Sequence, residues 1–265
     1  MRFILDGLWT GQTRSGPFRY DRAMLMCGPH SKHMPVTVNG SFATVTVVFQ
    51  AGALDALGGP GIAPLVDEIV TLDNVWSGVD AAWLDDFPLD QSPFAWLETM
   101  ERCLTAAFEQ TPAGAISPIT REFDRACLLD PNLRVADFAE RLDVTSRTVT
   151  RVINRDFGMP PKKVLQRARA LDLAAALRGI VEPEEREIAA LRYYDQSHMI
   201  REFSKIFETT PHAFRREAKP ILTLILELRQ ARRLEIIRQD RARRLPSWRN
   251  PKAEPVPLGP ALGPG

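Results

Sequence analysis

Two short stretches of the sequence place side chains that can bind the edges of nucleic-acid bases on one side of a helix. Arginine can hold guanine with two hydrogen bonds, glutamine can hold adenine in the same way, and the methyl groups of threonine or isoleucine can contact thymine. A solvated helix surface would carry similar polar residues, so one such helix alone does not decide between the two interpretations. The candidate residues are Arg147, Thr150, Arg151 and Arg155 in the first stretch, and Gln196, Ser197, Ile200, Arg201 and Lys205 in the second.

Both stretches belong to an internal repeat with a fixed offset of fifty residues, which aligns residues 135–161 with residues 185–211. A repeat of this kind marks one supersecondary unit that the chain uses twice. Because the polar faces recur at the same offset, chance is a poor explanation for them. The aligned pairs include Ala139 with Ala189, Val144 with Tyr194, Arg151 with Arg201, Phe157 with Phe207 and Pro161 with Pro211.

Each repeat unit has the pattern of two helices joined by a tight turn. In the first unit, apolar residues recur at helical spacing on both sides of a turn at residues 143–145. Thr145 is placed to cap the N-terminus of the second helix, as Asp195 is in the second unit. The small Ala139 lets the helices cross closely, and Val144 fills the gap between them. The sequence therefore predicts two helix-turn-helix units, whose second helices can enter the major groove of DNA.

The segment between the two units predicts a rigid linking helix. Pro160 and Pro161 are tolerated in a first helical turn, and Gly179 can end the helix after about Arg178. Such a helix would hold the two recognition helices in a fixed relation. That arrangement suits insertion into successive major-groove segments about 34 Å apart on one face of DNA.

Residues 131–218 resemble the DNA-binding domain of the AraC/XylS family of bacterial transcription regulators. The resemblance rests on DQSHMIREF at residues 195–203 and TPHAFR at residues 210–215, which are close to that family's second-unit signature. One departure is that Tyr193 and Tyr194 occupy a turn that lacks the family's glycine and is one residue shorter. The resemblance implies base contacts early in each recognition helix, at Arg147, Thr150 and Arg151 and at Ser197, Ile200 and Arg201.

The charge of the chain is distributed unevenly. Residues 1–130 contain 8 Lys and Arg against 16 Asp and Glu, whereas residues 131–265 contain 26 against 17. The total of +1 hides this asymmetry. An acidic first half and a basic second half indicate that only the second half meets a polyanion, here double-stranded DNA.

Cysteine content and hydropathy indicate the compartment. The three cysteines, an odd number, have no regular spacing, and no charged and then apolar leader opens the chain. No apolar stretch approaches the ~20 residues that a membrane span needs. We therefore expect a cytoplasmic protein without structural disulfides and without a membrane partner.

One group of residues could bind a metal. Cys27, His30 and His33 form the pattern C-x2-H-x2-H, but no second cluster follows to supply the fourth ligand that zinc sites need. Asp85, Asp86 and Asp90 have no histidine or metal ligand near them in the sequence. We therefore expect no catalytic residue, no metal and no cofactor. The alternative is a metal-binding or bifunctional enzyme or sensor that uses the helix-turn-helix domain for DNA targeting.

Residues 1–75 predict β structure, followed by helices at residues 93–110 and 117–129. Asn39-Gly40, between two β-branched runs, predicts a hairpin because both residues accept positive φ. Residues 63–70 could form a strand or a short helix. The predicted strands are Arg22–Met26, Pro35–Val38 and Phe42–Phe49, and Trp76, Trp83 and Trp96 are expected in the core.

This first half resembles a poorly characterised, cupin-like sensor domain that precedes some AraC-type domains. The resemblance rests on LMCGPHS at residues 25–31, TVTVVFQAGAL at residues 44–54 and VDEIVTLDNVW at residues 66–76. It implies effector sensing or dimerisation and names no ligand.

Residues 220–245 predict one further helix that is rich in arginine. Its apolar side could pack on the first half of the chain or on a second subunit. Its arginines could contact phosphates or form a solvated basic face.

The sequence as a whole predicts an α+β protein. A mainly-β, cupin-like domain is followed by an all-α domain of two helix-turn-helix units, about 135–158 and 185–208, joined by a linking helix. The expected function is sequence-specific regulation of transcription, modulated by the first domain through a small-molecule effector, contact with RNA polymerase or a homodimer. The expected boundaries are 1–115 for the sensor or dimerisation domain, 116–219 for the DNA-binding domain, 220–245 for the C-terminal helix and 246–265 for a disordered tail.

Overall fold

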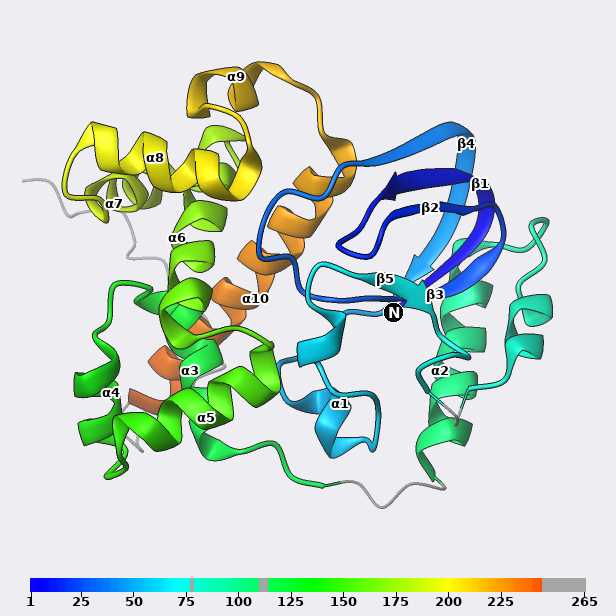
Figure 1. The fold of residues 1–265 in the computed structure, drawn as a ribbon, viewed down its shortest axis with the longest axis horizontal. Coiled ribbons are helices and arrows are strands. Elements are labelled where there is room, and N and C mark those ends of the chain that lie inside the picture. The colour runs from blue at the N-terminus through cyan, green and yellow to red at the C-terminus, as the bar shows by residue number, and fades with distance from the viewer. Residues whose placement is uncertain (77–78, 110–113, 245–265) are drawn as a thin grey trace, which may run out of the picture.

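A computed structural model describes residues 1–76, 79–109 and 114–244 (Figure 1). A small antiparallel sheet is formed by the first part of the chain, and helices form the rest, which confirms the predicted α+β class. The expected disordered tail at residues 246–265 lies outside the described residues. No helix of the described segments is long and apolar enough to cross a membrane.

The sheet is organised around its first strand, which the sequence analysis did not single out. β1 pairs with β2 and β3 and also with β4, and β3 pairs with β5, in each case antiparallel. The strands are β1 (Arg2–Gln12), β2 (Pro17–Tyr20), β3 (Ala23–Cys27), β4 (Val36–Thr46) and β5 (Ile69–Thr71). The predicted strand at Arg22–Met26 corresponds to β3.

The hairpin predicted at Asn39-Gly40 is wrong. Both residues lie inside β4, a single strand that covers the two runs expected to flank the turn. The register between β1 and β4 shifts between Ile4 and Leu8. Gly7 in β1 and Gly40 in β4 both have positive φ, 92° and 83°. The positive φ expected in this stretch is therefore found at Gly40, where it accompanies an irregularity in strand pairing and not a chain reversal.

The two faces of the sheet support two different clusters. One face, with Phe3, Leu5 and Met26, packs against a core that includes Trp76 and the helix α2 (Pro93–Glu109). Trp83 and Trp96 also pack against this core, which agrees with the expectation for the tryptophans. The other face carries a second cluster whose buried members are Ile4, Trp9, Leu25 and Ile69.

Short helices connect the sheet to the rest of the chain. α1 spans Ala53–Ala56, and the 3-10 helices η1 and η2 span Ala63–Leu65 and Ala81–Asp86. Residues 63–70, left open between strand and helix, form η1 and then enter β5. α2 confirms the predicted helix, although its first apolar residue, Phe94, is 78% exposed.

The described residues from 118 onward form eight helices and the loops that connect them. These helices enclose two hydrophobic cores. One core contains Val164, Leu165 and Ala168 from the first half of α6, and the other contains Leu173 and Ala174 from its second half. The linking helix thus belongs to both units. The helices are α3 (Pro118–Leu129), α4 (Val135–Arg141), α5 (Ser146–Phe157), α6 (Pro161–Leu177), α7 (Pro183–Leu191), α8 (Gln196–Phe207), α9 (Pro211–Arg216) and α10 (Pro220–Arg244).

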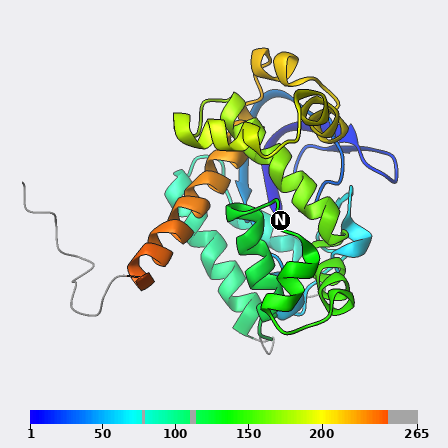
Figure 2. The same ribbon diagram turned by 90° about the vertical axis from the view of Figure 1, so that its left-hand side faces the viewer.

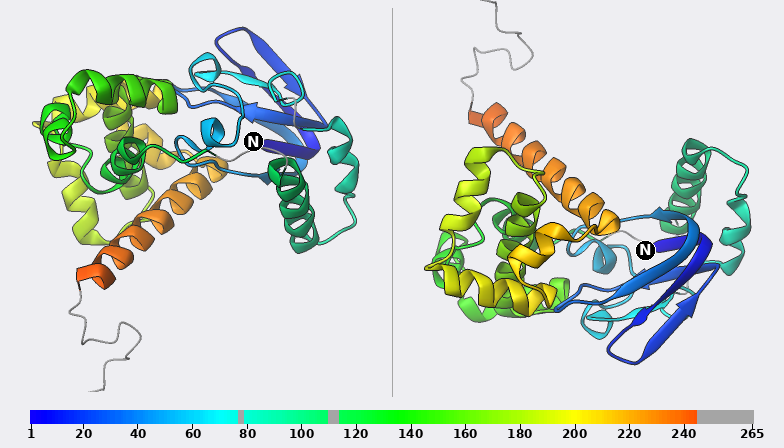
Figure 3. Two further views of the ribbon diagram at one scale, coloured as in Figure 1. Left: turned by 90° about the horizontal axis from the view of Figure 1, so that it is seen from below. Right: turned by 90° about the horizontal axis from the view of Figure 1, so that it is seen from above.

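The long helix α10 lies across α3 and α6 with its first residues beside the sheet (Figure 3). Ile221 packs against the second sheet cluster, and Leu226 is fully buried among the helices. The Arg229 Nη2 atom lies 2.8 Å from Asp172 Oδ1 of α6, and Arg232 pairs with Asp124 of α3. These two arginines are therefore engaged by neighbouring helices.

Candidate nucleic-acid interface

The helix predicted to be the first recognition helix is α5, and its N-terminus is capped as predicted. Thr145 Oγ1 accepts a hydrogen bond from the backbone N–H of Thr148 at 3.1 Å. This bond satisfies one of the free N–H groups that every helix start exposes. Val149 and Ile153 are fully buried on the inner side of α5. The polar side of the helix therefore faces away from the core.

The helix predicted to be the second recognition helix, α8, has the same construction. Asp195 Oδ1 accepts a hydrogen bond from the backbone N–H of His198 at 2.7 Å, which confirms the predicted cap. Phe203, Ile206 and Phe207 are buried on its inner side. A carboxylate at this position also interacts favourably with the positive end of the helix dipole.

Most of the candidate base-reading residues are exposed. Among the described residues, Arg147, Arg151, Arg201 and Lys205 form no ion pair, so their charges are available to a ligand. Thr150 is partly buried, and its hydroxyl donates to the carbonyl of Ser146 at 2.8 Å. The remaining exposed candidates are Gln196, Ser197 and Ile200.

Arg155 differs from the other candidates. Its Nε and Nη2 atoms donate to the two carboxylate oxygens of the buried Asp156, at 2.5 and 3.0 Å. Its Nε atom also lies 3.6 Å from Asp55 Oδ2 of α1. The hydrogen bond to Asp156 raises the pKa of the Arg155 guanidinium. This candidate therefore already has two carboxylate neighbours within the protein.

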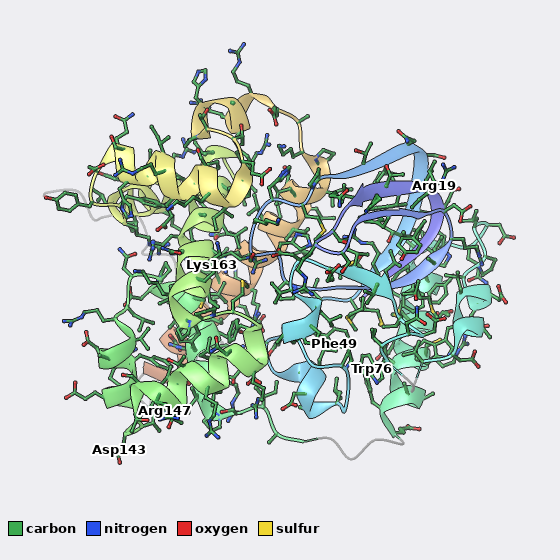
Figure 4. The ribbon with its side chains drawn as sticks, viewed as in Figure 1. Arg19, Phe49, Trp76, Asp143, Arg147 and Lys163 are labelled. Atoms are coloured by element: carbon green, nitrogen blue, oxygen red, sulfur yellow. The ribbon has the colours of Figure 1, made fainter. Side chains whose placement is uncertain are left out.

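The recognition helices point the same way. In Figure 1, α5 and α8 both begin on the side away from the sheet and end toward it. Figure 4 places Asp143 and Arg147 at that outer side, with Arg19 of the sheet at the opposite end of the molecule. Figure 2, which views that side, shows the two units one above the other. One surface thus carries the first turns of both helices.

Polar contacts across α6 tie the units together. The Arg169 guanidinium binds both carboxylate oxygens of Glu202 in α8, and its Nη1 atom donates to the carbonyl of Pro131 at 3.0 Å. Asn132 Nδ2 donates to the carbonyl of Arg192 at 3.0 Å. Sequence reasoning missed these residues. The available signal was Glu202, a carboxylate next to Phe203 on the apolar side of α8.

The fixed offset of fifty predicts equivalent turns in the two units. In the structure the two turns differ. That offset pairs Val144 with Tyr194, but Tyr194 is 95% exposed, whereas Tyr193 is 7% exposed and lies in the second core. Asp143 of the first turn has a φ of 51°, and no residue of the second turn has positive φ. Because the turns follow different backbone paths, the neighbouring tyrosine points inward.

The residues of the C-x2-H-x2-H pattern lie where the sheet meets the helices. Burial and the nearby Arg167 lower the pKa of His30 to about 4, so its imidazole is neutral near pH 7. His33 Nδ1 lies 3.6 Å from Glu208 Oε2 at the end of α8. Over the described part of the chain, no three His, Cys, Asp or Glu side chains are grouped to hold a metal ion.

Residues 138–217 match a family model described as a helix-turn-helix domain. The match supports a helix-turn-helix domain of the AraC type in this segment. The match includes α5, α6 and α8 and supports a DNA-binding transcription regulator, a class of binding proteins rather than of enzymes. The match leaves residues 1–137 outside it, and the strands β1 to β5 lie within them, between residues 2 and 71. No curated protein and no solved structure matches the chain.

Proposed function

We propose that this protein is a sequence-specific DNA-binding transcription regulator in which α5 and α8 read successive segments of the major groove. The observation that carries the proposal is the pair of capped helices whose first turns share one surface, with Arg147, Arg151 and Arg201 free of ion pairs among the described residues. Free guanidinium groups can hold guanine edges or phosphates. The exposed residues Gln196, Ser197, Ile200 and Lys205 and the methyl group of Thr150 complete the reading surface.

Arg155 has a different part in this proposal. Because Asp156 and Asp55 already neutralise it, it contributes to the interface through the position of α5 and makes at most a phosphate contact.

The first part of the chain, residues 1–115, modulates DNA binding in this proposal. A small-molecule effector, a second copy of the chain or RNA polymerase would act by changing how residues 116–219 present the two helices. A ligand can shift such an equilibrium only if it binds the two arrangements with different affinity. A regulator of this kind works in the cytoplasm, where bacterial DNA lies.

Selection of binding sites from random double-stranded DNA tests the proposal. The wild type is compared at fixed salt with the double variant Arg151→Ala, Arg201→Ala. We expect the wild type to select a motif of two segments and the variant to lose about 1–3 kcal/mol of discrimination at the bases that each arginine reads.

Arg19→Ala is the matched control, because Arg19 is exposed on β2, at the opposite end of the molecule from Arg147 (Figure 4). This variant should select the wild-type motif. Salt-sensitive binding without any motif, by the wild type itself, would contradict sequence-specific reading and indicate a phosphate-driven contact.

A further inference from the structure

The two recognition helices end at equivalent positions of the repeat. Gly158 caps the C-terminus of α5 and Glu208 caps that of α8, exactly one repeat later in the chain. Both residues adopt the left-handed conformation, with φ of 69° and 53°. Both also contact the N-terminal part of the protein, residues 1–115. The N-terminal part therefore contacts the C-terminal end of α5 and the C-terminal end of α8.

The contact at the first helix is tightly packed. A Cβ atom added at Gly158 would lie 2.6 Å from Val66 Cγ2 and 2.9 Å from Ile62 Cγ2, so the backbone of the cap lies directly against the segment around η1. Val66 also packs against the hydrophobic core of the first unit. The end of α5 is therefore fixed to the N-terminal part by apolar contact.

Polar groups extend this first contact. The buried carboxylate of Asp156 accepts a hydrogen bond from Thr120 of α3 and binds Arg155. Arg155 in turn reaches Asp55 of α1. A Cβ atom at Gly52 would lie 3.3 Å from Asp156 Oδ2, which places the start of α1 beside the same carboxylate.

The contact at the second helix is looser. The segment between β3 and β4 extends from the sheet toward the helices (Figure 1), and its His33 lies 3.6 Å from Glu208. These side chains are 32% and 59% exposed, so this contact is open to solvent. The N-terminal part thus holds α5 firmly and α8 weakly.

These contacts act at a distance from the reading residues. Each recognition helix has 12 residues and is about 18 Å long. The C-terminal ends touch the N-terminal part, whereas most candidate base contacts lie in the N-terminal halves of the helices, with Arg147 of α5 at the outer side (Figure 4). A change at the held ends therefore alters the separation and tilt of the reading ends. Major-groove segments on one face of DNA repeat at about 34 Å, so that separation decides which half-site spacing fits.

We propose that the N-terminal part of the chain sets the spacing between the DNA segments that α5 and α8 read, with Asp55 and His33 as positioning residues. The inference rests on the proposed function, because it assumes that both helices enter the major groove. It adds that a contact made by residues outside the helix-turn-helix domain determines one aspect of DNA specificity. The contact at the end of α8 is the more exposed of the two, so it is the one that a substitution alters more easily.

The test uses the full chain and a DNA library in which the two selected segments are separated by different numbers of base pairs. The test variant is Asp55→Lys, His33→Glu, which places like charges beside Arg155 and Glu208 and leaves both recognition helices unaltered. The control variant is Asp90→Lys, Gln91→Glu, which makes the same net charge change at two exposed residues that form no ion pair among the described residues.

We expect the wild type and the control to prefer one spacing by at least tenfold over spacings two base pairs longer or shorter. The test variant should lose most of that preference and retain its affinity for each isolated segment. An unchanged spacing profile in the test variant would overturn the inference. A wild type that selects no segments at all would instead contradict the proposed function, so the two failures are distinguishable.

A second measurement does not depend on DNA. Spin labels at Ser146→Cys and Gln196→Cys, two exposed residues at equivalent positions of the repeat, report the distance between the first turns of α5 and α8. Cys27→Ser removes the one native cysteine that is not buried. We expect one narrow distance distribution in the parent and the control and a broader one with Asp55→Lys, His33→Glu. Identical distributions would overturn the inference.

Discussion

Arg169 and Glu202 form a bidentate ion pair between the linking helix and the second recognition helix, with Nε–Oε1 and Nη2–Oε2 distances of 2.8 and 2.7 Å. Their side chains are only 15% and 6% exposed. The same guanidinium binds the carbonyl of Pro131, which precedes the first unit. A single side chain therefore joins α8 to α6 and to the residue that precedes the first unit.

Breaking this pair from one side should be costly. We expect Arg169→Met or Glu202→Leu alone to reduce the free energy of unfolding by about 3–5 kcal/mol, because each leaves a buried charge without its partner. The double variant should lose less than the sum of the two. Urea denaturation of the four proteins measures the coupling. Additive losses would show that the two groups act independently.

The two N-terminal caps should contribute similar stability. Thr145→Ala and Asp195→Ala each remove the acceptor of one backbone N–H group, and each should cost about 1 kcal/mol. Thr145→Ser keeps the hydroxyl and serves as the control, with an expected change well below that. Thermal and urea unfolding measure the differences. Equal losses in Thr145→Ala and Thr145→Ser would mean that the cap is not the cause.

The two neighbouring tyrosines should respond in opposite ways. Tyr193→Ala should reduce the free energy of unfolding by about 3–5 kcal/mol through loss of core contacts, whereas Tyr194→Ala should change it by about 0.5 kcal/mol or less. The Tyr193 hydroxyl is buried without a hydrogen-bond partner in the described residues, so Tyr193→Phe should be neutral or stabilising. Urea unfolding of the three variants measures this. Greater sensitivity at Tyr194 would reverse the assignment.

His30 should make stability fall in weak acid. Burial, and then the positive charge of Arg167, lower its pKa in the folded protein from 6.5 to about 4, while Asp67 opposes this effect. Since the folded state binds this proton less readily than the unfolded state, the stabilisation is complete above pH 6.5 and is lost as the pH falls toward 4. We expect a loss of about 1–3 kcal/mol from this group.

The His30→Asn variant isolates the effect. Urea unfolding at pH 7 and pH 4.5 gives the loss of stability for the wild type and for the variant, and carboxylates contribute equally to both. A smaller loss in the variant is the expected outcome. Equal losses would show that His30 titrates alike in both states.

The helical half was predictable because its signals are local. Each helix was indicated by signals that lie within a few residues of one another: a capping residue at 145 or 195, a proline at the helix start, or apolar residues at helical spacing. In the structure these helices lie close to their predicted bounds. The family match at residues 138–217 supports a helix-turn-helix domain in this part of the chain.

The features that escaped prediction depend on distant partners. The preference of Asn39-Gly40 for positive φ fits a turn and a strand irregularity equally well. Only the pairing of β4 with β1 shows that the irregularity is present. Counting at a fixed offset could not show which of Tyr193 and Tyr194 faces the core, because the two turns take different backbone paths. The carboxylates around Arg155 come from its own neighbour and from a residue 100 positions earlier in the chain.

The long-range polar contacts of α10 also bear on how the protein is made. Arg229 donates to the carbonyl of Cys127 across 102 residues, Arg232 binds Asp124 across 108, and Arg125 binds Asp240 across 115. While the ribosome is still translating the second helix-turn-helix unit, α3 lacks all three of these partners. Closing such long loops is slow relative to local helix formation. The helix α3 therefore gains these contacts only after α10 has emerged, and in an incomplete nascent chain the helices packed on α3 would lack this support.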